Sequence, residues 1–453
     1  MSTRRTLISL VGAAIAITVA APSPAAGAVE VVTVRQGPID LAPYQVVFPS
    51  DDTRRVRSPG LDGWLVRMRA RLVDENGRPL PVQDVMLHHV VYKNRERRDP
   101  VCTGTQSFYG TGEENQALVL PRGYGYRVRP GDRWTTGWML MNHRNVPRHA
   151  YIEYTAWVET SRRLRPVVPY WARATGCEFR KDPIYNVPGG SARTTHVKRA
   201  SLAVAHSGRI VAAGSHLHGG ATALELRRPG CGSGGPLLRS RPLYGLPDHP
   251  YYNVLPVLHE PGPIATSWYA DSRGIPVRRG ERLRVDSRYD GERPHVRVMG
   301  IWHLYIAPGA RPERRCPALP PRRGGTLPQV AGRPDPPAVS VPLTTLDSRG
   351  VAVTMLRPPG PIVSAGSRAA VELGSSGFAP RNLSVAAGAN VTWRFSAAGL
   401  HDVTLASGPR GFASRWNTTG ASFSRRLAVP GEYRLFCSLH PIAMNGLVKV
   451  RSR

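Results

Sequence analysis

Residues 431–450 read GEYRLFCSLHPIAMNGLVKV, and this stretch decides the fold of the C-terminal part of the chain. Apolar and β-branched residues dominate its two ends, so we expect two β-strands joined by a short loop. The loop carries Cys437, His440 and Met444. A buried unpaired thiol or a core-filling methionine would explain Cys437 or Met444 taken singly. A thiol, an imidazole and a thioether on one short loop instead predict a binding site.

A fourth side chain with a suitable donor comes from an earlier strand-like run. The run GLHDVTL at 399–405 supplies His401. A thiolate and two imidazoles bind copper in a trigonal plane, and a weak thioether takes the axial position. Cys437, His401 and His440 therefore predict the plane of a copper site, with Met444 as its axial ligand.

Residues 377–450, including the strand-like run NLSVAAGANVTWRF at 382–395, closely resemble plastocyanin- and pseudoazurin-like cupredoxins. The resemblance implies a Greek-key β-sandwich that holds one type 1, or blue, copper. It also implies one-electron transfer or copper carriage. The expected partner is an electron donor or acceptor, either a small reductant or a redox protein.

The whole chain has 453 residues, which suggests two to four domains at ~100–200 residues each. Its 46 Gly and 43 Pro favour turns and short strands over long helices. Short apolar runs separated by turn dipeptides predict an all-β fold with two jelly-roll-like β-sandwiches ahead of the cupredoxin sandwich. The expected divisions are a first sandwich at 29–195, a second at 196–316, a Pro/Gly-rich linker at 317–359 and the cupredoxin domain at 360–453.

The net charge is +30, with 61 Lys and Arg against 31 Asp and Glu. No block of five or more basic residues occurs and no nucleic-acid-binding motif is present, so a nucleic-acid partner is not expected. An arginine-biased composition spread over many loops explains the charge. An acidic partner or wall polymer is the alternative explanation.

The first 28 residues predict a signal peptide. Arg4 and Arg5 precede the apolar run 7–20, and Ala26-Gly27-Ala28 supplies small residues for cleavage. The Arg pair also fits a twin-arginine signal. We therefore expect a protein exported by the Sec or twin-arginine route, secreted or held in the cell envelope or periplasm, with no transmembrane segment.

Export allows disulfides, and the chain has five Cys. An odd number leaves one thiol for another purpose, and Cys437 is that thiol. The domain divisions favour Cys102–Cys177 and Cys231–Cys316 among the three pairings that the other four allow.

Three histidine motifs stand out ahead of the linker. His216 and His218 are two residues apart, so on a strand their side chains share a face. His88 and His89 are adjacent, so they can share one metal only where the strand bends or ends. His143 follows the apolar run WMLMN. A buried, hydrogen-bonded imidazole is the alternative for each.

The order of these motifs, followed by Met299 in VRVMGIWHLYIA, resembles the copper type II, ascorbate-dependent monooxygenases, the family of peptidylglycine hydroxylating monooxygenase and dopamine β-monooxygenase. The resemblance implies two coppers on either side of an open cleft. An electron-transfer copper would be held by His88, His89 and His143. The catalytic set, which would bind O₂ and hydroxylate a C–H bond of a small organic substrate, would be His216, His218 and Met299.

Two features depart from that family's pattern. The spacing from Met299 to the following LYI is longer than in the animal enzymes, and His303 lies close enough to compete as a ligand. No determinant of a particular substrate is present. Each remaining histidine, His259 among them, is expected to be exposed or hydrogen-bonded, and Glu113-Glu114 predicts a solvated turn.

Together these patterns predict an exported copper oxidoreductase with one type 1 copper and, if both N-terminal sets bind, two type II coppers. Electrons would enter at the blue copper and be used at the histidine-rich module. Two alternatives stay open: a copper-binding or copper-handling protein without catalysis, and a pure electron-transfer protein. The sequence does not decide whether the chain is an enzyme.

Overall fold

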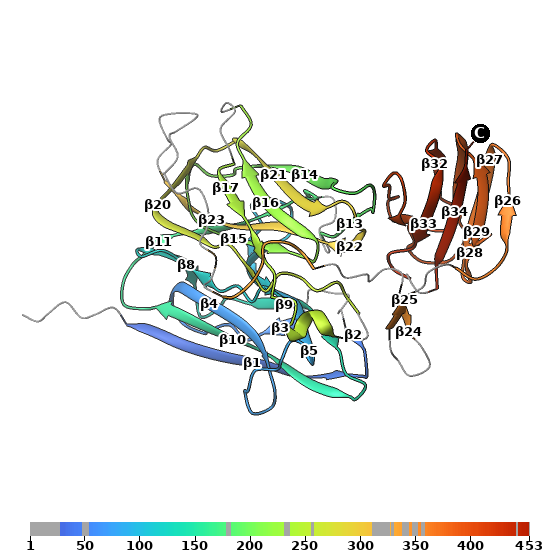
Figure 1. Ribbon diagram of the computed structural model, residues 1–453. Helices are drawn as coiled ribbons and strands as arrows, with labels where there is room; N and C mark the ends of the chain where they lie inside the picture. Colours follow the sequence, from blue (N-terminus) through green and yellow to red (C-terminus); the bar gives the residue numbers. More distant parts are fainter. Residues whose placement is uncertain are drawn as a thin grey trace, which may run out of the picture.

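The computed structural model describes residues 28–47, 54–177, 183–230, 236–254, 258–309, 327, 330–337, 344–346, 352–354, 358–440 and 443–452. In these ranges the chain forms β-strands and one 3₁₀ turn, η1 (Pro250–Asn253), with no α-helix. The all-β fold predicted from the sequence is confirmed, and the strands form three sandwiches (Figure 1). The expected signal peptide lies almost wholly outside the described residues.

No helix in the described ranges is long and apolar enough to cross a membrane.

The first sandwich has eleven strands: β1 (Val29–Leu41), β2 (Val46–Val47), β3 (Arg54–Val56), β4 (Gly63–Val73), β5 (Val85–Arg98), β6 (Thr105–Gly112), β7 (Leu118–Val119), β8 (Tyr124–Val128), β9 (Trp134–Asn142), β10 (Arg148–Glu159) and β11 (Arg165–Pro166). One sheet has the order β1-β10-β4-β8-β11, with β7 beside β4. The facing sheet has the order β2-β9-β5-β6, with β3 beside β9. Aromatic rings such as Phe108 and Trp134, with centroids 4.5 Å apart, fill the space between the sheets.

The second sandwich uses the next twelve strands: β12 (Val168–Arg173), β13 (Tyr185–Val187), β14 (Thr195–Ala203), β15 (Gly208–Leu217), β16 (Ala221–Arg227), β17 (Leu238–Ser240), β18 (Pro242–Leu243), β19 (Ala265–Thr266), β20 (Tyr269–Val277), β21 (Arg282–Asp290), β22 (His295–Val298) and β23 (Gly300–Pro308). Its two main sheets have the orders β12-β23-β15-β20 and β14-β21-β16-β17. The pairs β13-β22 and β18-β19 flank them. Strands β12 and β13, which precede residue 196, thus pair within the second sandwich.

The two N-terminal sandwiches share a buried interface along β15 and β23. Both strands are buried on both faces, as expected of strands with continuous apolar runs. On β23, Tyr305 packs in the first sandwich's core and donates a hydrogen bond to the Phe108 carbonyl (2.9 Å). Its neighbours Leu304 and Ile306 pack in the second core. Side chains that alternate along β15 and β23 therefore point either into the second core or toward the first sandwich.

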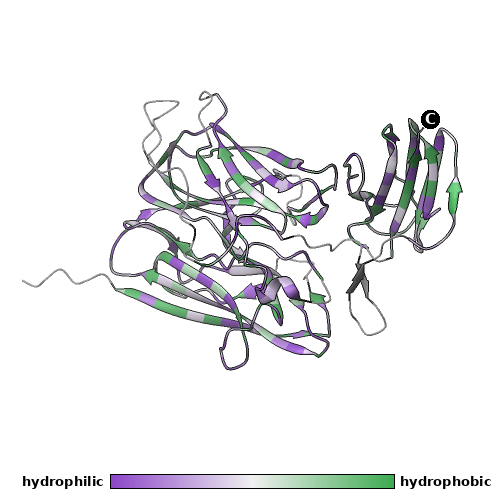
Figure 2. Cartoon of the chain, viewed as in Figure 1, coloured by the Kyte–Doolittle hydropathy of each residue, from purple (hydrophilic) through white to green (hydrophobic). Residues whose placement is uncertain are grey.

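The third sandwich follows a hairpin of β24 (Thr344–Leu346) and β25 (Ala352–Thr354) and comprises β26 (Ile362–Ser364), β27 (Arg368–Gly374), β28 (Gly377–Ala379), β29 (Asn382–Ala386), β30 (Ala389–Phe395), β31 (Thr404–Ser407), β32 (Ser422–Leu427), β33 (Gly431–Phe436) and β34 (Asn445–Arg451). Sheets β26-β29-β34-β33-β31 and β28-β27-β30-β32 face each other around Trp393. Apolar and polar residues alternate along many strands of the three sandwiches (Figure 2), which is the pattern that buries one face of a strand.

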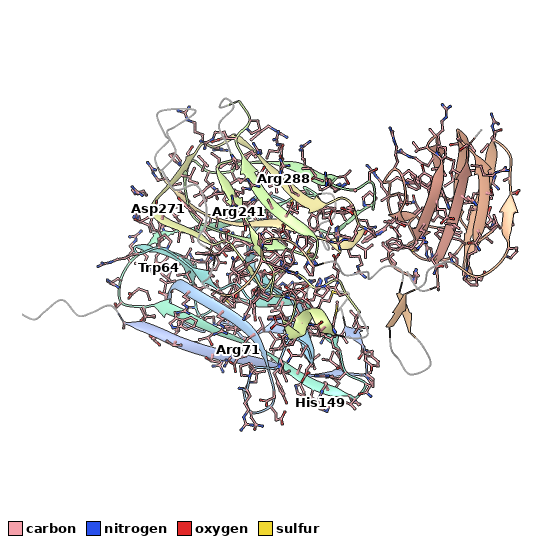
Figure 3. The ribbon with its side chains drawn as sticks, viewed as in Figure 1. Trp64, Arg71, His149, Arg241, Asp271 and Arg288 are labelled. Carbon is pink, nitrogen blue, oxygen red and sulfur yellow. A yellow bond between two sulfur atoms is a disulfide. The ribbon has the colours of Figure 1, made fainter. Side chains whose placement is uncertain are left out.

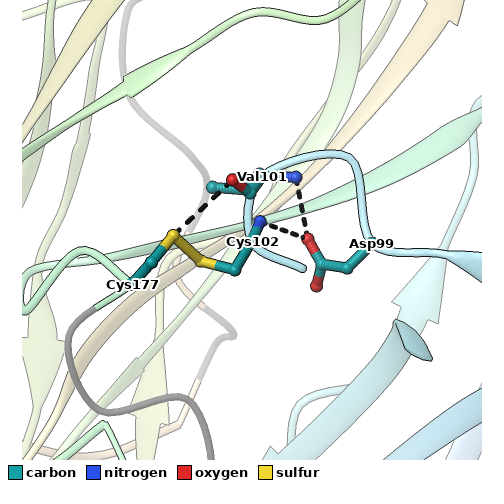
Figure 4. Close-up of a disulfide and its surroundings, with 4 residues drawn as sticks. All are labelled: Asp99, Val101, Cys102 and Cys177. Carbon is teal, nitrogen blue, oxygen red and sulfur yellow. Dashed lines mark hydrogen bonds between the residues drawn. A yellow bond between two sulfur atoms is a disulfide. The ribbon is translucent and has the colours of Figure 1, made fainter. Parts of the chain in front are cut away.

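The disulfide Cys102–Cys177 is confirmed, with an S–S distance of 1.98 Å. It joins the loop after β5 to the segment after β12 and so links the two N-terminal sandwiches (Figure 4). Asp99 shapes the loop, because its Oδ1 accepts hydrogen bonds from the backbone N–H groups of Val101 and Cys102 (2.8 and 3.0 Å). The expected Cys231–Cys316 pair lies outside the described residues.

Many arginines lie on solvated outer faces beside acidic partners. Arg71, on the outer face of the first sandwich (Figure 3), forms an ion pair with Glu153 (2.9 Å), which also contacts Arg35. Arg288, in the second sandwich, contacts Glu225 (3.2 Å). These positions fit an arginine-rich composition spread over the surface.

Candidate metal centres

The C-terminal donors come together at one end of the third sandwich. His401 Nδ1 lies 3.9 Å from Cys437 Sγ, and His440 Nδ1 lies 3.7 Å from the same sulfur. One donor atom of each of the three residues lies within 4.8 Å of the other two. Met444 is buried in the same core as Cys437. The loop is closed by backbone bonds from Cys437 N to Met444 O and from Met444 N to His440 O (both 2.8 Å).

The donor set fits a copper ion. His401 Nε2 lies 3.0 Å from the Ala398 carbonyl, to which it donates its proton. The tautomer that this bond selects leaves Nδ1 unprotonated, with its lone pair available on the side of Cys437. Burial raises the pKa of the Cys437 thiol to about 11. A cation bound there would favour the thiolate, so a buried thiol between two imidazoles suits a metal that takes sulfur and nitrogen ligands.

Asp402 ties the segment that carries His401, just before β31, to the loop that carries Cys437. Its Oδ1 accepts hydrogen bonds from Ser438 N (2.6 Å) and Ser438 Oγ (2.9 Å), and its Oδ2 accepts one from Thr404 Oγ1 (2.6 Å). Asp402 is fully buried, and burial raises its pKa. These bonds fix the distance between the two segments, as partners outside the ligand set do in metal sites.

The second sandwich contacts this site through β13. Asn186 Nδ2 donates to Asp402 Oδ2 (2.7 Å) and to Ser438 Oγ (3.1 Å), while Asn186 Oδ1 accepts from Arg297 N (3.0 Å). Nearby, Gly189 N donates to the Leu405 carbonyl (2.9 Å). In Figure 1, β13 and β22 form the edge of the second sandwich that faces the third.

A second cluster of donors lies between the two N-terminal sandwiches. His88 Nδ1 and His89 Nδ1 are 3.0 Å apart, and His216 Nε2 and His218 Nε2 are also 3.0 Å apart. The rings of His88 and His218, which belong to different sandwiches, have centroids 4.6 Å apart. His259 completes the group, with its Nε2 3.0 Å from His88 Nε2.

Strand irregularities explain why these histidines converge. The pairing of β5 with β9 shifts register between Leu87 and His89, so His88 is the extra residue of a bulge. Two adjacent histidines can share one metal only where the strand bends or ends, and this bulge lets the rings of His88 and His89 approach one another. At the end of β15, Leu217 packs in the second core, while His216 and the next residue after the strand, His218, both face the first sandwich.

Two adjacent carboxylates complete the cluster, and the prediction of a solvated turn for them is wrong. Glu113 Oε1 lies 3.7 Å from His88 Nε2 and 3.4 Å from His259 Nε2. Glu114 contacts His216 Nδ1 at 3.1 Å. Both carboxylates are buried, because β6 ends at the interface of the two sandwiches.

The pKa values of the imidazoles in this cluster shift in different directions. Burial, then the neighbouring histidines, lowers the pKa of His88 and of His218 well below the usual value. Burial also lowers the pKa of His89 to about 3. Burial would lower the pKa of His216 too, but Glu114 outweighs it and raises that pKa. His88, His89 and His218 are therefore neutral near pH 7 and keep a lone pair for a ligand bond.

Two predicted residues lie at the edge of the cluster. His143 is buried, and neither of its ring nitrogens has a hydrogen-bond partner among the described residues. Burial lowers the pKa of His143 to about 4; His259 adds to this shift and Glu113 opposes it. Met299 is buried in an apolar cluster with Trp171 and Ile301. It precedes Gly300, which pairs with Leu217 on β15.

The structure thus brings together histidines that the sequence assigned to two separate sites. His88 and His89 were expected across an open cleft from His216 and His218, but the rings of His88 and His218 are in contact. The expected cleft is wrong, because β5 and β15 face each other across the shared interface. The two expected ligand sets themselves stay predictions. Sequence reasoning missed Glu113 and His259, which no local motif marks.

Comparison with known proteins identifies two segments. Residues 367–451 match the copper binding proteins of the plastocyanin/azurin family, so the third sandwich is a copper-binding cupredoxin domain. Residues 132–309 match the family described as Stress up-regulated Nod 19. A search of curated proteins found no match. The resemblance of the N-terminal region to copper monooxygenases stays a prediction.

Solved structures similar to the C-terminal domain include two cupredoxins. The first is a novel purple cupredoxin from Nitrosopumilus maritimus, with 25% identity over 18% of this chain and 99% of that chain and a TM-score of 0.17. The second is a point mutant of amicyanin in its reduced Cu(I) form, with 25% identity over 18% of this chain and 82% of that chain and a TM-score of 0.18.

Proposed function

We propose that this chain is an exported copper redox protein whose cupredoxin domain exchanges electrons with the N-terminal sandwich pair of the same chain. The observation that carries the proposal is the Asn186 contact, which joins the second sandwich to the residues that hold the cupredoxin site. Copper bound by Cys437, His401 and His440, with Met444 on the axis, supplies one-electron exchange between its two oxidation states.

The protein's own residues support a short route between the domains. Asp402 bonds to Ser438, the residue after Cys437, and Asn186 links Asp402 to the backbone of Arg297. A chain of hydrogen bonds therefore leads from the cupredoxin site to the backbone of Arg297. Burial is the largest cause of the lowered pKa of His89 and of His218, and the charge of Arg297 adds to both shifts.

An outside electron donor or acceptor would meet the exposed part of the site. His440 is exposed, whereas Cys437 and His401 are buried. Leu400, next to His401, is 45% exposed and adds an apolar surface there. A small reductant or a redox protein can approach His440 without separating the domains.

The experiment is rapid photoreduction of the copper-loaded full-length protein, followed through its blue absorption. The proposal predicts a phase whose rate is independent of protein concentration, because the electron moves within one molecule. Replacement Asn186→Ala should slow that phase while the blue absorption is unchanged, and the exposed Asn390→Ala serves as the matched control. A rate that depends only on protein concentration, or an unchanged rate in Asn186→Ala, would contradict the proposal.

A second candidate function is hydroxylation of a C–H bond with O₂ at the histidine cluster. The observation that favours it is that one side chain links His218, just after β15, to Met299, between β22 and β23: the Tyr289 hydroxyl accepts from His218 N (3.0 Å) and donates to Met299 O (2.6 Å). Under this proposal His216, His218 and Met299 hold a type II copper, which supplies reaction with O₂.

The test of this candidate is product formation from a panel of small organic substrates with ascorbate as reductant. Met299→Leu should abolish product and leave the blue absorption intact, whereas Met68→Leu, in the first core, should change neither. Full activity in Met299→Leu would contradict the assignment. Copper binding without product from any substrate would favour a copper-handling protein.

A further inference from the structure

We propose that His88, Glu113, His218 and His259 hold one divalent transition-metal ion at the interface of the two N-terminal sandwiches. His88 comes from one of the two ligand sets predicted from the sequence, and His218 comes from the other. Glu113 and His259 belonged to neither set. Copper bound at this site would be the second redox centre of the proposed function. This redox role rests on the proposed function, whereas the metal site itself does not.

The distances between the donor atoms match the edges of a metal tetrahedron. Ligand bonds of ~2.0–2.1 Å to a tetrahedral ion place neighbouring donors about 3.3 Å apart. The three edges formed by His88 Nε2, His259 Nε2 and Glu113 Oε1 measure 3.0, 3.4 and 3.7 Å. A donor atom of His218 lies within 4.8 Å of each of them. An ion can therefore be bound with shifts of a few tenths of an ångström in the first three side chains.

Partners outside the four ligands orient them. Glu113 Oε2 accepts hydrogen bonds from the Tyr251 hydroxyl and from Gly262 N, which leaves Oε1 directed at the two histidines. A Cβ at Gly262 would lie 2.5 Å from Glu113 Oε2, so only glycine permits this contact. On the other side, His216 Nε2 contacts His218 Nε2 while Glu114 contacts His216 Nδ1. Carboxylate and backbone partners of this kind accompany metal ligands in proteins.

A purely hydrogen-bonded histidine cluster explains the site less well. His218 Nδ1 is buried and has no hydrogen-bond partner among the described residues. A buried nitrogen without a partner loses the hydrogen bond that water would provide and so destabilises the fold. The buried carboxylate of Glu113 is also costly unless a positive charge compensates it. A bound cation would satisfy both requirements at once.

The donors define the class of ion. Three imidazoles and one carboxylate suit borderline metals such as Cu²⁺ and Zn²⁺, and Cu²⁺ binds such sets more tightly. Ca²⁺ and Mg²⁺ prefer oxygen ligands only. The site therefore favours Cu²⁺ over Zn²⁺ and excludes the alkaline-earth ions.

The experiment counts bound metal in the full-length protein after the blue site has been removed. The background variant is His401→Ala with Cys437→Ala, loaded with Cu²⁺ and freed of excess metal. We expect one ion per chain by elemental analysis, with a non-blue EPR signal. Glu113→Gln and His259→Ala should each weaken Cu²⁺ binding by about 100-fold or more, since even partners outside the ligand set contribute ~10–100-fold.

The controls separate a lost ligand from a lost fold. His149→Ala removes an exposed histidine on β10 (Figure 3) and should retain the ion. In the otherwise wild-type chain, His259→Ala should keep the blue absorption, which reports an intact cupredoxin domain. Unchanged affinity in both Glu113→Gln and His259→Ala, or a count of zero or two in the background variant, would overturn the proposal. Binding of Zn²⁺ but not Cu²⁺ would support the site and contradict its redox role.

Discussion

Replacing Asp402 tests how strongly the cupredoxin site depends on one buried carboxylate. Its oxygens accept four hydrogen bonds, from Ser438 N, Ser438 Oγ, Thr404 Oγ1 and Asn186 Nδ2, at 2.6 to 2.9 Å. At about 1 kcal/mol each, Asp402→Ala would cost about 4 kcal/mol. Burial of the carboxylate also costs free energy and raises its pKa, so removing it recovers part of the stability lost with the hydrogen bonds. We expect a net loss of about 2–3 kcal/mol in the free energy of unfolding of this domain.

The assay is thermal unfolding of the copper-loaded protein, followed by the blue absorption so that only the cupredoxin domain is observed. For a domain of this size, 1 kcal/mol shifts Tm by ~4–8 °C, so Tm should fall by about 10–20 °C. The control Glu372→Ala removes a surface ion pair with Arg394 (3.5 Å) and should change the unfolding free energy by no more than about 1 kcal/mol. A shift of less than about 2 °C in Asp402→Ala would refute the argument that these bonds hold the site together.

Three further predictions concern stability and docking. Burial alone would raise the pKa of Glu153, but hydrogen bonds from Arg35 and Arg71 lower it. Above pH ~4.3, the free energy of unfolding in urea should therefore be about 1–3 kcal/mol higher for wild type than for Glu153→Gln. This difference should disappear as pH falls through the lowered pKa of Glu153. A constant difference down to about pH 2 would contradict the prediction. Cys102→Ser removes the disulfide that joins residues 75 positions apart, and it should lower the free energy of unfolding in urea by about 4 kcal/mol. An unchanged free energy would show that the two sandwiches dock without the disulfide. Gly189→Ala would place a Cβ 2.3 Å from the Ala406 carbonyl oxygen, so the domains should separate and small-angle scattering should show a larger radius of gyration; an unchanged radius would contradict the docking.

The cupredoxin domain could be predicted from the sequence because its chemistry is local. Three of its four predicted donors lie on the loop between β33 and β34, so the residue types and spacing within one short segment predict a copper site. The fourth, His401, lies three residues before Thr404 of β31, which pairs with Phe436 at the start of that loop. The partner Asp402 was visible as the neighbour of His401, but its four hydrogen bonds depend on the fold.

The histidine cluster could be predicted only in part because its donors come from four distant segments. The His216–His218 spacing predicted that both rings share one side of the chain, and at the end of β15 both do face the first sandwich. The approach of His88 to His89 depends on a bulge, which the sequence does not show. His259 and Glu113 carry no motif, and their role follows from the interface between two sandwiches. Adjacent carboxylates usually mark a solvated turn, and here the end of β6 buries both.

The most direct test of the account is the number and type of metal ions in the copper-loaded, full-length wild-type protein, counted by elemental analysis and separated by EPR. The account predicts two copper ions per chain, one with a blue signal and one with a non-blue signal that Glu113→Gln and His259→Ala remove. A single blue copper, with the N-terminal sandwiches free of metal, would contradict it.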